Sequence, residues 1–539
     1  MRFSLRPSLQ CLVVSIAAAL SIGSSQTAFA QTKKYSCPNF FADIHQSLDC
    51  IEAVFSETPA HLTFSGVPPG NGMALGGVLE DQIHYVSPFA PKADPNLRAG
   101  SLRLTPDYEQ GYKSLVHRYV TVAGSTNGSW FASGGVDWLP PLHYVPGSRF
   151  VGPVRPNGSR AKETCHRLGP LCTQSVFGLS FAGTHRSVQT VAFYGLGSTS
   201  PSTKYVYQLN ETYGGASARM PIFNWLTLNG QIEYRQPDLP GLTSANAVNL
   251  NFSETTAPGL ASQPPFMHYG TGVTTLARVL SEPVSPDADA AKETPPLMKR
   301  RFVYSFLNEA DYHWYSDRDT GHYSFQEFVF SGDETIQFGG VIEEYVPATK
   351  VKAFPFLKRS FYQFIGHSCG VVDQREKPAP EIDPATGKKQ AVPSTRVAND
   401  LRVTDPCDFG KLEIKTYLAL SHAGSGDVIP FYMQPTVGGS DIDSRLSLRG
   451  FADYRFRAPD ATFIQTEYSV PISGPIGGLA FYDAGNVGQT LSGLSFAHLR
   501  QDAGVGGAVR FGGSVVAQVY LAMGAGHGVH LGYNLAKVF

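Results

Sequence analysis

The one short motif in the chain that fits a catalytic pattern is Gly366-His367-Ser368-Cys369-Gly370, which matches the GxSxG pattern of a hydrolase nucleophile. That mechanism needs the serine on a sharp turn between a strand and a helix. An apolar run precedes the motif at Phe361–Ile365, but a polar stretch rich in proline follows it in place of a helix. The phosphate-binding GxxxxGK pattern does not occur either. We therefore expect no enzymatic activity and no cofactor.

Cysteines are the second set of residues that could carry chemistry. Six of the seven lie beyond the first thirty residues, at Cys37, Cys50, Cys165, Cys172, Cys369 and Cys407. An even number in an exported chain suggests disulfides, and pairing the sequence neighbours is the simplest of about fifteen possible arrangements. A metal site is the alternative, but neither CxxC nor HExxH occurs, so we expect no metal.

The N-terminus has the pattern of an export signal. Arg2 and Arg6 precede an apolar run at Leu12–Ile22, and Ala28-Phe29-Ala30 fits the small-x-small cleavage pattern. We predict a signal peptide over 1–30, which would remove the seventh cysteine, Cys11, from the exported chain. A buried N-terminal helix is the alternative.

Composition narrows the class of protein. The net charge is −1 and the pI is about 6.9, which argues against nucleic-acid binding because that function needs a basic surface. Hydrophobic residues make up 42% of the chain, which is enough to bury a core and argues against disorder. No run of about 18 apolar residues follows the first thirty positions, so no transmembrane helix is expected in the exported chain.

The elements expected after the N-terminus are strands. Asn127-Gly128 separates two alternating runs within His117–Trp138, a hairpin pattern. Further segments alternate apolar and polar residues over Leu412–Leu420, Thr462–Val470 and Ser514–Met523. In the second of these, Glu467 lies on the polar side. Two polar segments, 281–296 and 370–399, read as exposed loops.

These runs are about ten residues long, which crosses a bilayer when the strands tilt by about 45°. Only a closed barrel satisfies the backbone groups of every strand in a membrane, and apolar-out, polar-in alternation is its expected pattern. The sequence therefore predicts an all-β fold, a transmembrane antiparallel β-barrel over 62–539. A short helix over 40–56, held by Cys37–Cys50, is expected within the N-terminal segment 31–61. A soluble β-sandwich or another periplasmic β-protein is the alternative.

Four motifs near the C-terminus carry a resemblance to a known family. Gly438-Gly439-Ser440 is followed by Leu448-Arg449-Gly450-Phe451, by Thr466-Glu467-Tyr468 and by the run from Ala480 to Val487. In this order the motifs over 411–539 resemble the bacterial surface-antigen barrels, the BamA/TamA superfamily. The chain also ends in Phe539 after alternating residues that include Tyr533, which resembles the assembly signal of bacterial outer-membrane barrels.

The resemblance implies a barrel of sixteen strands with one extracellular loop folded into the lumen. Arg449 would lie at the tip of this loop, with Gly450 and Phe451 beside it, and its wall partners would be Glu467 and Asp483. Phe481 shares the face of Asp483. A guanidinium forks onto carboxylates in a way that lysine cannot copy, so we predict a lock between loop and wall.

The resemblance also implies a class of function. Family members that insert or translocate proteins carry periplasmic POTRA domains, and the residues ahead of a first strand near Gly72–His84 are too few for one. We expect a member without POTRA domains, in the outer membrane, that assists protein or lipid insertion or translocation. Its partners would be outer-membrane lipid and client outer-membrane proteins or a periplasmic protein, and glycines at both ends of the barrel would leave its seam flexible. A non-catalytic surface platform, an adhesin-like barrel and a passive channel are the alternatives.

Overall fold

A computed structural model describes residues 60–64, 68, 70–72, 74–86, 113–139, 178–223, 225–280, 301–341, 371–372, 381–382, 389–390, 402–403, 406–473, 476–494, 499–511, 514–524 and 528–535. The export signal, the helix expected over 40–56, the GxSxG motif and Phe539 lie outside these residues, as do all the cysteines except Cys407.

The structure is one antiparallel sheet of sixteen strands, in which each strand pairs with its neighbours along the chain. Its strands are β1 (Ala60–Phe64), β2 (Ala74–Val86), β3 (Lys113–Ser125), β4 (Trp130–Leu139), β5 (Gly178–Phe193), β6 (Tyr205–Phe223), β7 (Leu226–Asp238), β8 (Phe266–Leu280), β9 (Arg301–Asp317), β10 (Phe325–Val341), β15 (Pro406–Ala423), β18 (Asp460–Ser473), β19 (Ile476–Gly488), β20 (Arg500–Phe511), β21 (Ser514–Gly524) and β22 (Gly528–Leu535). The predicted all-β, antiparallel fold is confirmed.

Short elements lie in the connections between these strands. They are α5 (Val248–Asn251), β11 (Val371–Val372), β12 (Glu381–Ile382), β13 (Lys389–Gln390), β14 (Arg402–Val403), η5 (Phe431–Met433), β16 (Thr436–Val437), β17 (Phe456–Arg457) and η6 (Leu491–Gly493). No helix in the described part of the chain has both the length and the apolar character needed to cross a membrane.

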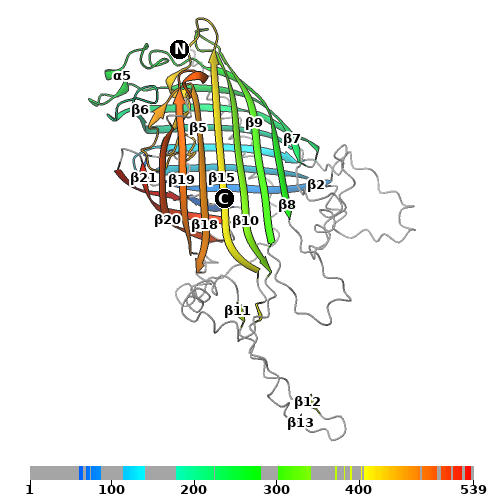
Figure 1. Ribbon diagram of the computed structural model, residues 1–539. Helices are drawn as coiled ribbons and strands as arrows, with labels where there is room; N and C mark the ends of the chain where they lie inside the picture. The colour runs from blue at the N-terminus through cyan, green and yellow to red at the C-terminus, as the bar shows by residue number, and fades with distance from the viewer. Residues whose placement is uncertain are drawn as a thin grey trace.

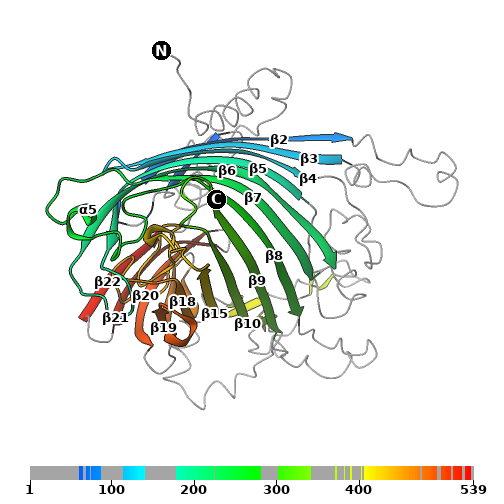
Figure 2. The ribbon, with the colours of Figure 1, turned by 90° about the horizontal axis from the view of Figure 1, so that it is seen from above.

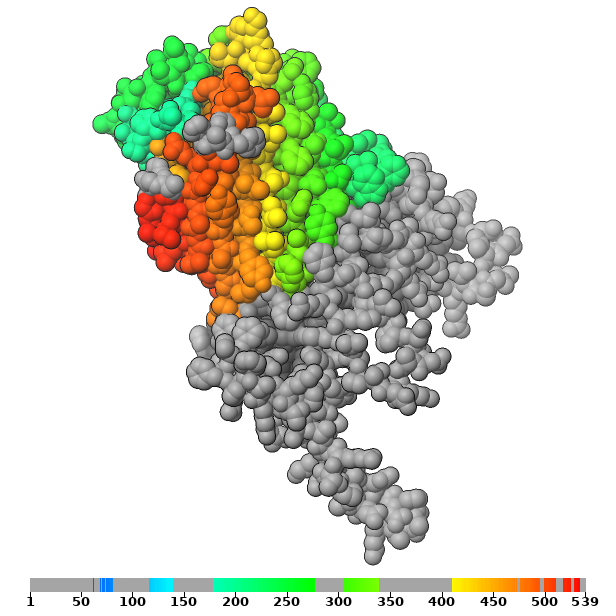
Figure 3. Space-filling view, in the orientation of Figure 1, coloured from blue at the N-terminus to red at the C-terminus, as the bar shows by residue number. Residues whose placement is uncertain are grey.

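The sheet is strongly curved and encloses an interior. The strands from β2 to β7 arch over one side, and those from β15 to β22 close in from the other (Figures 1 and 2). From outside, β8 to β21 form a continuous wall (Figure 3). No backbone pairing joins β1 to β22 among the described residues.

Alternation along the strands separates an apolar outer face from a polar inner face. On β18, Ile464 and Tyr468 are 39% and 41% exposed, whereas Gln465 and Ser469 are buried. The predicted two-residue period of Thr462–Val470 is therefore confirmed. Exposed apolar side chains recur on other strands, at Leu75, Leu79, Val122, Ile232, Tyr312, Trp314, Tyr482, Val519, Leu521 and Met523.

The predicted hairpin at Asn127-Gly128 is also confirmed. It joins β3 to β4, and Gly128 has the positive φ of 87° that such a turn favours in glycine. Asn71, fully buried, ties this turn to its surroundings: its Oδ1 accepts hydrogen bonds from Asn127 and Ser129, and its Nδ2 donates to the Thr190 carbonyl.

The predicted position of the first strand is wrong. The segment near Gly72–His84 forms β2, and the five-residue β1 precedes it and pairs with Leu75–Leu79. A strand this short leaves no periodic pattern to detect. Gly76 is also not a flexible seam residue, because it is paired on both sides.

Gly76 and its neighbour Gly77 test this packing as a matched pair. A Cβ at Gly76 would lie 2.5 Å from the Cβ of Ala123 and 2.4 Å from the Val122 carbonyl oxygen, whereas one at Gly77 would meet nothing within 4 Å. We expect Gly76→Ala to lower the free energy of unfolding by about 1–3 kcal/mol and Gly77→Ala to leave it almost unchanged. Denaturant or thermal unfolding of the refolded proteins measures both, and equal effects would contradict this packing.

Candidate functional site: a loop locked inside the sheet

The loop between β15 and β18, residues 424–459, folds back inside the curve of the sheet (Figure 2). Its apolar residues pack against the inner wall: Leu448, Phe451 and Phe456 are buried with Phe463 and Val487 of the wall. Because the loop reaches across to other strands as well, it obstructs the interior.

Two glycines at the base of the loop explain the Gly-Gly-Ser motif. Gly438 and Gly439 have positive φ angles of 107° and 55°, and a Cβ on Gly439 would lie 2.5 Å from the Asp453 nitrogen. The Gly439 amide donates to the Leu448 carbonyl, and its carbonyl accepts from the Ser447 amide. This pairing brings the segment that carries Arg449 back toward the wall.

Arg449, Glu467 and Asp483, the three charged residues expected to form the lock, lie together in the structure. The guanidinium donates two hydrogen bonds to Asp483, from Nε to Oδ2 at 2.8 Å and from Nη2 to Oδ1 at 2.7 Å. Its Nη1 donates to Glu467 Oε2 at 2.5 Å. The backbone amide of Arg449 also donates to Asp483, at 3.2 Å. The fork onto Asp483 is the geometry that lysine cannot reproduce.

The surroundings of Arg449 keep its charge fixed. The residue is 3% exposed, and its Cζ lies 3.6 Å from the ring centroid of Phe481, an arrangement that favours a cation. Burial lowers the pKa of the guanidinium, but the hydrogen bonds and charges of Asp483 and Glu467 raise it by more, so the pKa lies above its ordinary value. The group therefore acts as a permanent positive charge.

Gly450 packs closely against β20 and β21. Its φ is not positive; instead a Cβ there would lie 2.7 Å from the Asp502 Cβ and 2.9 Å from the Gly524 nitrogen. A Cβ on Gly524 would likewise lie 2.8 Å from the Gly450 oxygen. The paired glycines let the loop backbone contact β21, so Gly524 supports the lock, although the sequence suggested flexibility at the seam.

A third wall acid, Asp502, was not singled out by the sequence. It lies directly opposite Asp483 in the β19–β20 register and is 3% exposed. Arg449 pairs with Glu467 and Asp483, and no ion pair to Asp502 is present among the described residues. Neither of its carboxylate oxygens has a hydrogen-bond partner of good geometry. One guanidinium therefore faces three acids.

A second anchor joins the loop to the opposite wall. Asp443 forms an ion pair with Arg186 of β5, with 2.8 Å between Oδ1 and Nη1. Arg186 also forms an ion pair with Glu211 of β6, with 2.6 Å between Nη2 and Oε2. Arg445 lies over the ring of Tyr417 on β15, 4.3 Å from its centroid. The Arg186–Asp443 pair joins residues 257 positions apart, so no local spacing in the sequence indicates it.

Two further arginines complete the docking. Arg455 donates to both the hydroxyl and the carbonyl of Ser200. Arg457 donates to the Tyr207 hydroxyl of β6 at 3.3 Å and, within the loop, to the Phe431 carbonyl at 2.6 Å. The loop is thus held by three buried arginines of its own, Arg449, Arg455 and Arg457, and by Arg186 of β5. Chemically this arrangement positions a segment by charge-assisted hydrogen bonds, which are stronger than neutral ones.

The other predicted site residues are placed as follows. Phe451 is buried in the loop core, and Tyr533 is exposed on β22. The backbone of Cys407 pairs with Gly340, and the remaining candidate disulfide cysteines lie outside the described residues. Within the described ranges, no cluster of three or more His, Cys, Asp or Glu could hold a metal.

Comparisons with known proteins give structural similarity at low identity. No family model and no curated protein matches the chain. Solved structures similar to it include BamA from Haemophilus ducreyi lacking POTRA domains 1-3, at 9% identity over 89% of this chain and 70% of that chain, with a TM-score of 0.40. CdiB from Acinetobacter baumannii is 10% identical over 88% of this chain and 58% of that chain, with a TM-score of 0.38. CdiB from Escherichia coli is 10% identical over 89% and 62%, with a TM-score of 0.39.

Removal of the guanidinium tests the lock. Arg449→Ala would leave the buried Asp483 and the half-buried Glu467 without their guanidinium partner, so we expect a loss of about 3–5 kcal/mol in the free energy of unfolding. Arg449→Lys should recover only part of this, because lysine cannot form the fork. Thermal unfolding of the refolded variants measures both, and an Arg449→Ala protein that melts like the parent would show that the loop does not dock as described.

Two carboxylate-to-amide changes are expected to act in opposite directions. Asp502→Asn removes a carboxyl group that lies opposite Asp483. At alkaline pH, where both carboxyl groups carry charge, this should raise the free energy of unfolding by up to about 1 kcal/mol. Glu467→Gln removes a partner of Arg449 and should lower it. Denaturant unfolding of both variants at alkaline pH decides the matter, and a loss of stability in both would refute this account of the excess negative charge.

Proposed function

We propose that this chain forms a barrel in the bacterial outer membrane, of the BamA/TamA type, and that it assists protein or lipid insertion or translocation there without catalysis. The outer face supports the membrane placement. Exposed apolar side chains on β2, β7, β9, β18, β19 and β21 would cost free energy in water, whereas hydrocarbon accommodates them.

The docked loop argues against a passive channel. Arg449, Asp443 and Arg455 fix it to three different parts of the inner wall. An open pore would require the loop to leave the interior, which would break the hydrogen bonds of these arginines. The interior is therefore closed at rest.

The observation that carries the proposal is the shortness of the first strand. Among the described residues, β1 pairs with Leu75–Leu79 of β2, whereas β2 continues to Val86. At the other end, β22 pairs with β21 over eight residues. Backbone groups at such edges can pair with an added strand, a common mode of peptide recognition. A client strand at this seam would be a direct route to insertion.

A rigid surface platform is the second candidate, because two connections at the loop end of the sheet are well organised. Glu254 accepts hydrogen bonds from the Ala261 amide and the Tyr323 hydroxyl, and Asp317 accepts them from the amides of Asp319 and His322. Such fixed loops could present a binding surface without any opening of the seam.

Location is tested by fractionation and by gel mobility. We expect the exported protein in the outer-membrane fraction, soluble only with detergent, and with a gel mobility that changes on heating. These properties follow from an apolar outer face and a continuous, hydrogen-bonded sheet that resists detergent until heated. Recovery of a β-rich protein from the soluble periplasm without detergent would contradict the barrel proposal.

Cross-linking the two edge strands separates the candidate functions. Leu62→Cys on β1 and Leu531→Cys on β22 place thiols on exposed outer-face positions, in a background that lacks the native cysteines. We expect the oxidised protein to stop supporting assembly of client outer-membrane proteins and the reduced protein to support it. Val519→Cys on β21 with Leu62→Cys is the matched control. Unaltered assembly by the oxidised Leu62–Leu531 protein would favour the platform.

A further inference from the structure

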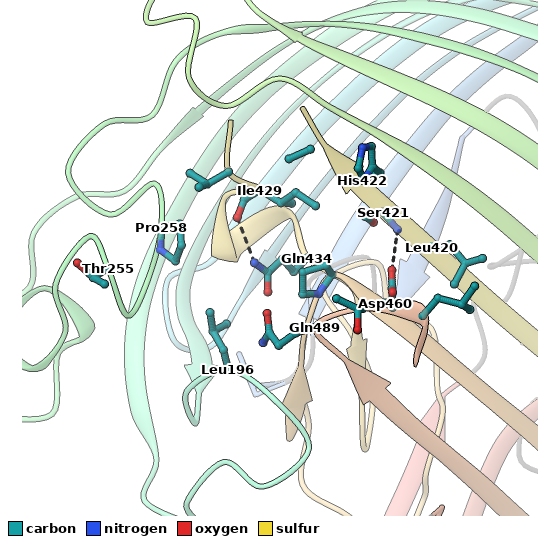
Figure 4. A pocket seen from close by; sticks show the side chains of 15 residues that line it. Leu196, Thr255, Pro258, Leu420, Ser421, His422, Ile429, Gln434, Asp460 and Gln489 are labelled. Atoms are coloured by element: carbon teal, nitrogen blue, oxygen red, sulfur yellow. Dashed lines mark hydrogen bonds between the residues drawn. The ribbon is translucent and has the colours of Figure 1, made fainter. Parts of the chain in front are cut away.

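A cavity of about 550 Å³ lies at the loop end of the sheet, apart from the Arg449 lock. It sits where two neighbouring strands separate: pairing of β15 with β18 ends at Ala419 and Ala461, but β15 continues to Ala423 beside β10. The connections after β5, β7 and β19 complete its walls, with η6 at the rim (Figure 4).

The cavity has an apolar wall and a polar floor. Its apolar lining is Leu196, Pro258, Leu420, Val428, Ile429 and Leu491. Gln434 and Asp460, which are only 6% and 4% exposed, provide the floor. Concave, mostly apolar sites with a few fixed polar groups are typical of small-molecule binding.

Gln434 presents an unused acceptor to this space. Its Nε2 donates to the Ile429 carbonyl at 3.1 Å, which fixes the side chain (Figure 4). Its Oε1 is buried and has no hydrogen-bond partner among the described residues. A buried acceptor left without a donor is unfavourable, so the position favours an occupant that brings one.

Asp460 adds a negative charge beside this acceptor. One carboxylate oxygen accepts the Ser421 amide at 2.9 Å, where the edge of β15 is no longer paired with β18 (Figure 4). No ion pair to Asp460 is present in the described part of the chain. His422 also lines the cavity.

We propose that this cavity binds a small organic ammonium ion with an apolar body. The ammonium group has several donors and no acceptor, so it matches an amide oxygen and a carboxylate. Its charge complements Asp460, and its apolar body fits the wall made by Leu420, Ile429 and their neighbours. An anion would meet like charge and a second acceptor at the floor. This binding requires neither seam opening nor a client protein.

The test measures binding of 2-phenylethylamine by calorimetry at pH 8 to the full chain in detergent, with empty micelles subtracted. We expect saturable binding that is at least tenfold weaker in Asp460→Asn, since asparagine keeps the acceptor for the Ser421 amide but removes the charge. Ala423→Leu should also weaken binding by filling the cavity. Asp238→Asn, at the end of β7 and outside the lining, is the matched control and should bind as the parent does.

Three results would overturn the proposal. The first is uptake no greater than that of empty micelles, which would mean that water alone satisfies Gln434. The second is equal binding of 3-phenylpropionate, which would mean apolar partitioning without charge recognition. The third is parental affinity in both Asp460→Asn and Ala423→Leu while gel mobility shows both variants folded.

Discussion

The structure depends on one buried positive charge. A guanidinium as deeply buried as that of Arg449 would be strongly unfavourable without carboxylates, and these come from β18 and β19. Their positions determine where the loop must run. The route in turn requires Gly438 and Gly439 at its base and close packing of Gly450 against Gly524. The need to pair the buried charge of Arg449 thus constrains the backbone conformation of a loop of more than thirty residues.

The interior combines clusters of buried apolar side chains with charged pairs. Buried apolar groups cluster where the loop meets the wall, as Leu448 and Phe456 do beside Phe463. Between such clusters, arginines join the loop to the wall, for example Arg186 of β5 to Asp443 of the loop and Arg457 of the loop to the Tyr207 hydroxyl of β6. Each pair is favourable only while the loop is docked, so the loop and the curvature of the sheet stabilise each other.

The sequence predicted interactions between residues close together in the chain better than those between residues far apart in it. A two-residue period is local, so the faces of β18 and the turn at Asn127-Gly128 could be assigned, and the motif around Arg449 indicated its partners. β1 was too short to show a period. The contact of Gly450 with Gly524 and the pair of Arg186 with Asp443 join distant strands, and only the three-dimensional arrangement of the sheet brings them together.

The position of the loop also limits how the proposed seam could open. The loop contacts β19 through Asp483, β20 through Asp502 and β21 through Gly524, so three strands beside the edge are joined to a segment that is anchored across the interior. β22 pairs with β21 alone, and β1 covers only part of β2. Separation at β22 or β1 would break a few backbone hydrogen bonds, whereas separation between β19 and β21 would also break the lock. Any opening compatible with a docked loop is therefore confined to the outermost strands.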